Sequence, residues 1–125
     1  MLKIWFVDDM ENNRQTWLRS FPQTLQSNHE FKTFACVETL FTALDTGQFP
    51  DILFIDYYIG PRHGHEVVDY FQAQTSRPLL IAHSSMMDAN KVMLSRGADL
   101  YLKKTPGTKH TDSITEQIQS EDDLI

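Results

Sequence analysis

Five polar residues follow short apolar segments of the chain: Asp8, Asp9, Asp56, Ser84 and Lys104. Carboxylates that lie close together repel each other unless a cation joins them, and Mg²⁺ prefers such oxygen ligands. With the cation bound, one carboxylate can attack a phosphoryl group while a lysine amine and a hydroxyl stabilise the phosphoryl oxygens. These residue types therefore fit phosphoryl transfer to an aspartate better than they fit a hydrolase triad.

Each of these residues also has an ordinary structural explanation. The Asp pair and Ser84 can cap the helices that follow them, Asp56 can begin a turn, and a single lysine such as Lys104 is commonly a solvated charge. The argument for a joint site is that these residue types occur together, after several separate apolar segments. We therefore expect the fold to assemble them.

The segments that must position these residues alternate in character. Short apolar runs predict strands over residues 2–7, 31–36, 52–55, 79–82 and 98–102. Apolar residues at helical spacing predict helices over residues 10–21, 37–44, 65–74, 88–96 and 108–119. We expect Pro22 to end the first helix, and residues 60–64 to form a loop.

This alternation predicts an α/β fold in which right-handed crossovers build a parallel sheet. Residues 52–55 are all apolar, which is typical of a strand covered by helices on both faces. The expected architecture is a doubly wound, five-stranded parallel sheet, whose functional groups collect beyond the carboxyl ends of the strands. We expect one domain over residues 1–120 and a frayed acidic tail over residues 121–125.

Composition excludes several other classes of protein. Acidic residues outnumber basic ones, 17 against 11, and the resulting charge of −6 argues against a broad nucleic-acid surface. A single cysteine, Cys36, excludes an internal disulfide framework. No apolar run approaches the roughly 20 residues of a spanning helix, and the apolar N-terminal segment lacks a signal-peptide cleavage site. We therefore expect a cytoplasmic protein that contacts neither nucleic acid nor a membrane.

Four stretches of the chain match a known family in order and spacing: IWFVDD at 4–9, DILFID at 51–56, GHE at 64–66 and GADLYLKK at 97–104. With them the chain resembles, over nearly its whole length, the receiver domain of two-component response regulators. The resemblance implies the flavodoxin-like (βα)5 fold. It also implies a role for each matching residue.

In this resemblance Asp56 is the phosphoacceptor and Lys104 pairs with the phosphoryl group. The implied Mg²⁺ ligands are Asp8, Asp9, Asp56 and the backbone carbonyl of Tyr58. The implied switch pair is the hydroxyl of Ser84 and the aromatic ring of Tyr101.

The hydroxyl position admits more than one register. Counting from Pro78 points to His83, whereas counting back from Gly97 points to Ala82. Ser84 is the first hydroxyl after the apolar segment and Ser85 follows it. We assign the position to Ser84, with His83 and Ser85 as alternatives.

The function implied by the resemblance is a phosphorylation-activated switch and not an enzyme that turns over a separate substrate. A sensor histidine kinase or a phosphotransfer protein would donate the phosphoryl group with Mg²⁺. The phosphorylated surface would then bind a downstream protein target or a second copy of the chain.

Two alternatives remain open at this stage. A pseudo-receiver would bind partners constitutively, without phosphorylation, and two departures from the family pattern motivate it. Thr105 stands where a proline usually follows the lysine, and Gly60 lies where a Met-Pro pair is common. A phosphatase with an aspartyl nucleophile is disfavoured, because Tyr58 stands where that chemistry needs a second acid.

Overall fold

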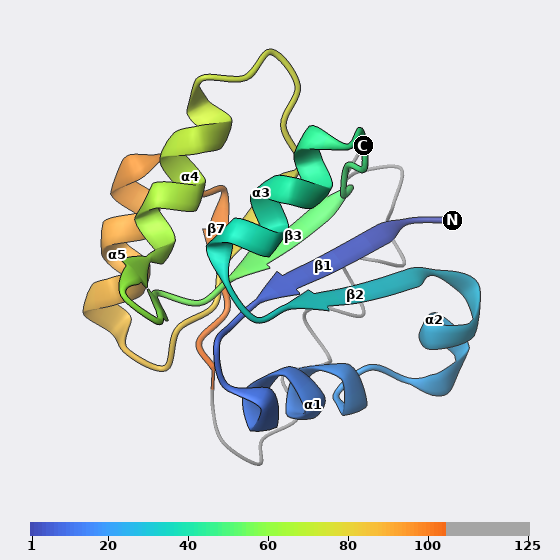
Figure 1. Cartoon of the computed structure of the whole chain (residues 1–125). Coiled ribbons are helices and arrows are strands. Elements are labelled where there is room, and N and C mark those ends of the chain that lie inside the picture. The colour runs from blue at the N-terminus through green and yellow to red at the C-terminus, as the bar shows by residue number, and fades with distance from the viewer. Residues whose placement is uncertain (105–125) are drawn as a thin grey trace.

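The computed structural model describes residues 1–104, so the helix expected over 108–119, the domain end at 120 and the acidic tail lie outside the described residues. A five-stranded parallel sheet forms the centre of the described part (Figure 1). Its strands are β1 (Lys3–Val7), β2 (Glu30–Phe34), β3 (Ile52–Ile55), β6 (Leu79–Ala82) and β7 (Leu100–Tyr101). They pair in the order β2-β1-β3-β6-β7, all parallel, which confirms the predicted fold class.

Within residues 1–104 the helices are α1 (Glu11–Arg19), α2 (Gln23–Asn28), α3 (Val37–Asp45), α4 (Gly64–Gln72) and α5 (Met87–Arg96). Helices α3, α4 and α5 cover one face of the sheet, and α1 lies on the other (Figure 1). Two apolar cores follow from this arrangement. Trp5 and Val7 pack in one core with residues of α3 to α5, whereas Ile4 and Phe6 pack in the other with Trp17 of α1.

The strand order contains a topological switch point, where the direction of the connections reverses. The chain leaves β1 for β2 on one side and returns to β3 on the other, so the connections diverge beyond the carboxyl ends of β1 and β3. Parallel α/β sheets bind ligands at such a switch point. Asp8 follows β1 and Asp56 follows β3, so both predicted acids lie there.

Helix α2 was not expected from the sequence. The first helix ends at Arg19, before Pro22 and earlier than predicted, and Pro22 is instead the N-cap residue of α2, with φ −58°. Proline suits this place because its fixed φ is close to helical and its missing N–H is not needed there. Leu25 anchors the short helix in the core on the α1 side.

The predicted loop over residues 60–64 is partly ordered as a small hairpin. Strand β4 (Tyr58–Ile59) pairs antiparallel with β5 (Arg62–His63), and Gly60 takes φ 61° in the tight turn between them. Gly64 then begins α4, and a Cβ there would lie 2.2 Å from the carbonyl oxygen of Asp56. Glycine at this position therefore lets α4 start directly against the acid's backbone.

Candidate phosphoryl-transfer site

The main-chain ladder of the sheet continues one residue beyond three of its strands. The amide of Asp8 donates to Phe34 O (3.0 Å), that of Asp56 to Val7 O (3.1 Å), and that of His83 to Ile55 O (2.8 Å). In the register of the paired strands, Asp8, Asp56 and His83 are consecutive neighbours in one row across the sheet. The strands thus fix the two acids side by side through their own backbone bonds.

Lys104 follows the edge strand β7, and its side chain reaches both acids. Its Nζ lies 2.8 Å from Asp8 Oδ2 and 3.2 Å from Asp56 Oδ1. Its backbone amide donates to Ser84 O (3.0 Å), which extends the β6–β7 ladder past the end of β7. The predicted convergence of Asp8, Asp56 and Lys104 is therefore present in the structure.

Asp8 is the most firmly held member of the site. Its side chain is fully buried, and its Oδ1 accepts from the Met10 amide (2.8 Å) and from Asn13 Nδ2 (3.3 Å). Arg14 Nη1 also donates to the Asp8 backbone oxygen (2.8 Å). The start of α1 therefore orients this carboxylate from one side while Lys104 binds it from the other.

Asp9 completes an acidic cluster at the surface. Asp8, Asp9 and Asp56 each offer one carboxylate oxygen, and these oxygens lie within 4.8 Å of one another. Asp9 is exposed, and its Oδ2 accepts a hydrogen bond from the Gly60 amide (3.0 Å), which ties it to the β4–β5 turn. Clustered hard oxygen donors that remain open to water on one side fit the chemistry of a Mg²⁺ site.

The pKa of Asp56 reflects this crowding. Burial, which is the largest cause, and the nearby Asp8 carboxylate raise the pKa of Asp56, Lys104 opposes them, and the net change is from 3.8 to about 6. At neutral pH the group is thus largely ionised, yet its charge is poorly compensated. A bound cation would remove much of this repulsion.

The structure places the remaining predicted residues as follows. Ser84 is buried one residue beyond the row of acids, and its Oγ accepts from the Met86 amide (3.1 Å). Among residues 1–104, no hydrogen bond joins that hydroxyl to Asp56 or Lys104. Tyr101, in β7 beside Ala82, is 43% exposed, and Tyr58 begins β4. The switch pair and the Tyr58 carbonyl ligand therefore stay predictions.

Sequence reasoning weighed His83 only as an alternative in this region, but the register puts it directly beside Asp56. Counting from Pro78 was the signal that pointed to it. The ring is 1% exposed and lies edge-on to Phe6 and Phe54, with centroids 5.5 Å away in each case. Both phenylalanines belong to the core on the α1 side, so His83 faces that side of the sheet.

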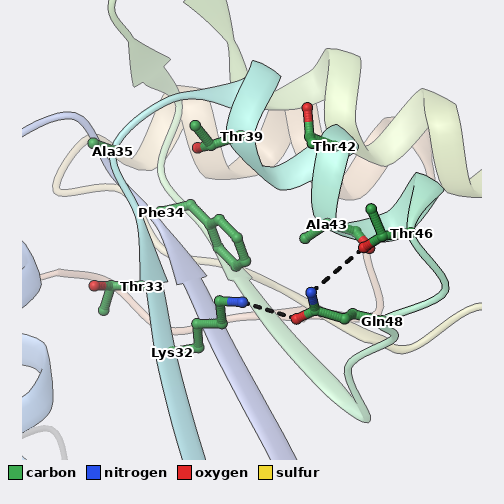
Figure 2. A pocket seen from close by; sticks show the side chains of 9 residues that line it. All are labelled: Lys32, Thr33, Phe34, Ala35, Thr39, Thr42, Ala43, Thr46 and Gln48. Carbon is green, nitrogen blue, oxygen red and sulfur yellow. Dashed lines mark hydrogen bonds between the residues drawn. The ribbon is translucent and has the colours of Figure 1, made fainter.

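A hollow lies elsewhere, between the edge strand β2 and helix α3 (Figure 2). Its volume is about 500 Å³ and threonines make up much of its lining. Lys32 Nζ donates to Gln48 Oε1 across it (2.8 Å; Figure 2), and this ammonium also lies over the ring of Trp5, 5.6 Å from the centroid. None of the acidic residues Asp8, Asp9 and Asp56 lines this hollow.

No helix within residues 1–104 combines the length and the apolar character needed to cross a membrane.

Comparison with known proteins rests on structure, since neither a family model nor a curated protein sequence matches the chain. The response regulator TrrA from Thermotoga maritima, solved in complex with Mg²⁺-BeF, is 20% identical with a TM-score of 0.76, and the match covers 100% of both chains. A response regulator receiver domain from Methylobacillus flagellatus is 18% identical with a TM-score of 0.74, covering 94% of this chain and 98% of that one.

The N-terminal domain of an uncharacterized protein from Wolinella succinogenes is 26% identical with a TM-score of 0.68, covering 98% of this chain and 94% of that one. Sequence identity with these structures is low, while the whole fold is shared. The strand order and the acids at its switch point agree with this result. The chain has the fold of a response regulator receiver domain.

Proposed function

We propose that this protein is a receiver whose Asp56 accepts a phosphoryl group in a Mg²⁺-dependent reaction. The observation that carries the proposal is the placement of Lys104 Nζ against both Asp8 (2.8 Å) and Asp56 (3.2 Å), next to the exposed Asp9. The phosphoryl donor would be a phosphohistidine on a histidine kinase or a phosphotransfer protein. A small acyl phosphate would serve as a substitute in vitro.

The reaction forms one bond and breaks one. An oxygen of the ionised Asp56 bonds to phosphorus while the bond between phosphorus and the donor breaks, and the leaving group keeps the electron pair. The Lys104 ammonium is close enough to neutralise charge on the transferred oxygens. Asp8 and Asp9 would hold the Mg²⁺, which supplies further charge neutralisation when it is bound.

The unfavourable electrostatics support this proposal over a purely structural explanation. Three carboxylates face one ammonium, and burial together with Asp8 raises the pKa of Asp56 to about 6. A structural ion pair needs no such excess of negative charge. The excess is expected where a cation binds and where a carboxylate reacts.

The test is labelling with acetyl phosphate and Mg²⁺, followed by intact mass spectrometry. Wild type should gain the mass of one phosphoryl group, and Asp56→Asn should gain none. Asp51→Asn is a matched control, because Asp51 lies at the opposite end of β3, where its carboxylate accepts from the Lys3 amide (2.8 Å). Labelling of Asp56→Asn at the wild-type level would refute the site.

A pseudo-receiver gives a different result in the same experiment. It would remain unlabelled at every donor concentration, and Mg²⁺ would not alter the fluorescence of Trp5 or Trp17. In that case the protein would act through constitutive binding. Labelling that is confined to Asp56 excludes this alternative.

A further inference from the structure

The segment that carries Lys104 is held to β6 by a main-chain ladder with one irregular position. The Leu102 amide donates to Ala82 O (2.9 Å), and the Lys104 amide donates to Ser84 O (3.0 Å). Parallel strands have evenly spaced hydrogen bonds. A regular ladder would therefore place a bond from the Ser84 amide to the Leu102 carbonyl between these two.

Side chains make the bonds at that position instead. The Ser84 amide donates to Asn90 Oδ1 in α5 (2.8 Å), and Asn90 Nδ2 donates back to Ser84 O (2.9 Å). The Leu102 carbonyl bonds to ring Nδ1 of His83 at 2.6 Å. The Asn90 side chain of α5 thus binds the Ser84 amide in place of the Leu102 carbonyl. The His83 imidazole binds that carbonyl instead.

This contact determines which ring nitrogen of His83 carries hydrogen. A backbone carbonyl oxygen can only accept, so Nδ1 must be the donor. The rings of Phe6 and Phe54 pack edge-on against the buried imidazole and restrict its rotation. The bond from His83 to Leu102 therefore joins the row that contains Asp8 and Asp56 to the segment just before Lys104.

We propose that His83 is a positioning residue of the phosphoryl-transfer site, which acts by holding the 102–104 segment so that the Lys104 amine reaches Asp56. The inference rests on the proposed function of Asp56 and adds a residue to that site. His83 is Asp56's neighbour in the row on one side and bonds to the Lys104-bearing segment on the other. Its role is distinct from that of Ser84, whose hydroxyl bonds to Met86.

A pair of variants separates this role from simple core filling. In His83→Asn the amide Nδ2 can replace the ring Nδ1 as donor, whereas His83→Leu fills the space without a donor. If the Leu102 link is lost, the segment that carries Lys104 is held less firmly against Ser84. Hydrogen exchange at the Lys104 amide, followed by NMR, should therefore become faster in His83→Leu and stay near the wild-type rate in His83→Asn.

Labelling by acetyl phosphate gives the second measurement. His83→Leu should be labelled more slowly, by roughly three- to tenfold, as expected for the loss of one positioned hydrogen bond. His83→Asn should recover most of the rate. The proposal is overturned if the two variants behave alike, or if His83→Leu leaves the hydrogen exchange of the Lys104 amide unchanged.

Two further outcomes keep the inference separate from folding and from the proposed function. If the variants do not fold, the ¹⁵N spectrum of the wild-type imidazole decides, since a neutral ring with hydrogen only on Nε2 contradicts the Leu102 bond. If wild type is not labelled at all, the proposed function fails. The positioning role is then judged by the hydrogen exchange of the Lys104 amide alone, which needs no phosphoryl donor.

Discussion

Two lysines in this fold lie in very different surroundings. Lys104 lies between two buried carboxylates at the carboxyl edge of the sheet, with Asp9 close by. Lys32 lies in the groove between β2 and α3, where it donates to the neutral Gln48 and covers the ring of Phe34, 5.3 Å from its centroid (Figure 2). The groove has a volume of about 500 Å³, but of these two regions only the first has an uncompensated charge.

The difference shows which physical feature marks the functional region. A lysine that covers aromatic rings and bonds a neutral amide satisfies its surroundings without any ligand. One ammonium cannot neutralise three clustered carboxylates, so their mutual repulsion lowers the stability of the folded protein. Uncompensated charge therefore identifies the site here better than the presence of a hollow does. The comparison can be tested by changing each lysine and each source of charge.

The largest effect is expected for Lys104→Met. This change leaves Asp8, which is fully buried, and Asp56 without their cation, so the free energy of unfolding should fall by about 3 kcal/mol at pH 7. Urea denaturation measures the loss, and Mg²⁺ should recover part of it. A loss below about 1 kcal/mol would place Lys104 among ordinary surface lysines and remove the contrast with Lys32.

The pH dependence of stability should show the strain on Asp56 directly. Its pKa is raised from 3.8 to about 6, so the folded protein holds this proton more tightly than the unfolded chain does. The contribution of Asp56 to the free energy of unfolding should therefore fall by roughly 2 kcal/mol as pH rises from about 4 to about 6.

Other carboxyl groups contribute to the pH dependence of the free energy of unfolding with the opposite sign. Arg62 holds the pKa of Glu38 below its usual range, and Arg96 does so for Asp69. The informative quantity is therefore the difference between wild type and Asp56→Asn in urea denaturation at each pH. A difference that does not vary between pH 4 and pH 7 would show that Asp56 is not strained.

A smaller effect is expected from Mg²⁺ on the wild-type protein. An ion that binds only the folded state raises the free energy of unfolding by about 1.4 kcal/mol when its concentration is ten times the dissociation constant. The increase should be lost in Asp9→Asn, because that change removes one of the three clustered carboxylates. The same increase in Asp9→Asn and Asp56→Asn would mean that the cation binds elsewhere.

The sequence was sufficient to predict the sheet and the meeting of its acids and lysine. Each strand is a short apolar run, and parallel strands bring their carboxyl ends to one edge. Asp8, Asp56 and Lys104 were therefore expected at one edge of the sheet, and the strand order β1-β3-β6-β7 then brings them together. Helix α2 was missed because its one buried apolar side chain, Leu25, gives no helical periodicity.

The arrangement around His83 could not be predicted from the sequence for a different reason. The apolar run ends at Ala82, and neither His83 nor Ser84 reveals which of them continues the row of acids. The deciding bonds join residues that are not adjacent in sequence: Asn90 binds the Ser84 amide, and His83 binds the carbonyl of Leu102. Counting from flanking prolines and glycines cannot detect such tertiary contacts.

The smallest effect should come from Lys32→Met, the counterpart of Lys104→Met. Methionine keeps an apolar stem over Trp5 and Phe34, so the change removes only the cation–π attraction and the bond to Gln48. The expected loss in the free energy of unfolding is below about 1 kcal/mol. Labelling of Asp56 and the response to Mg²⁺ should equal those of wild type. A slower labelling rate would instead show that the groove is energetically coupled to the acidic site, and that uncompensated charge alone does not delimit the functional region.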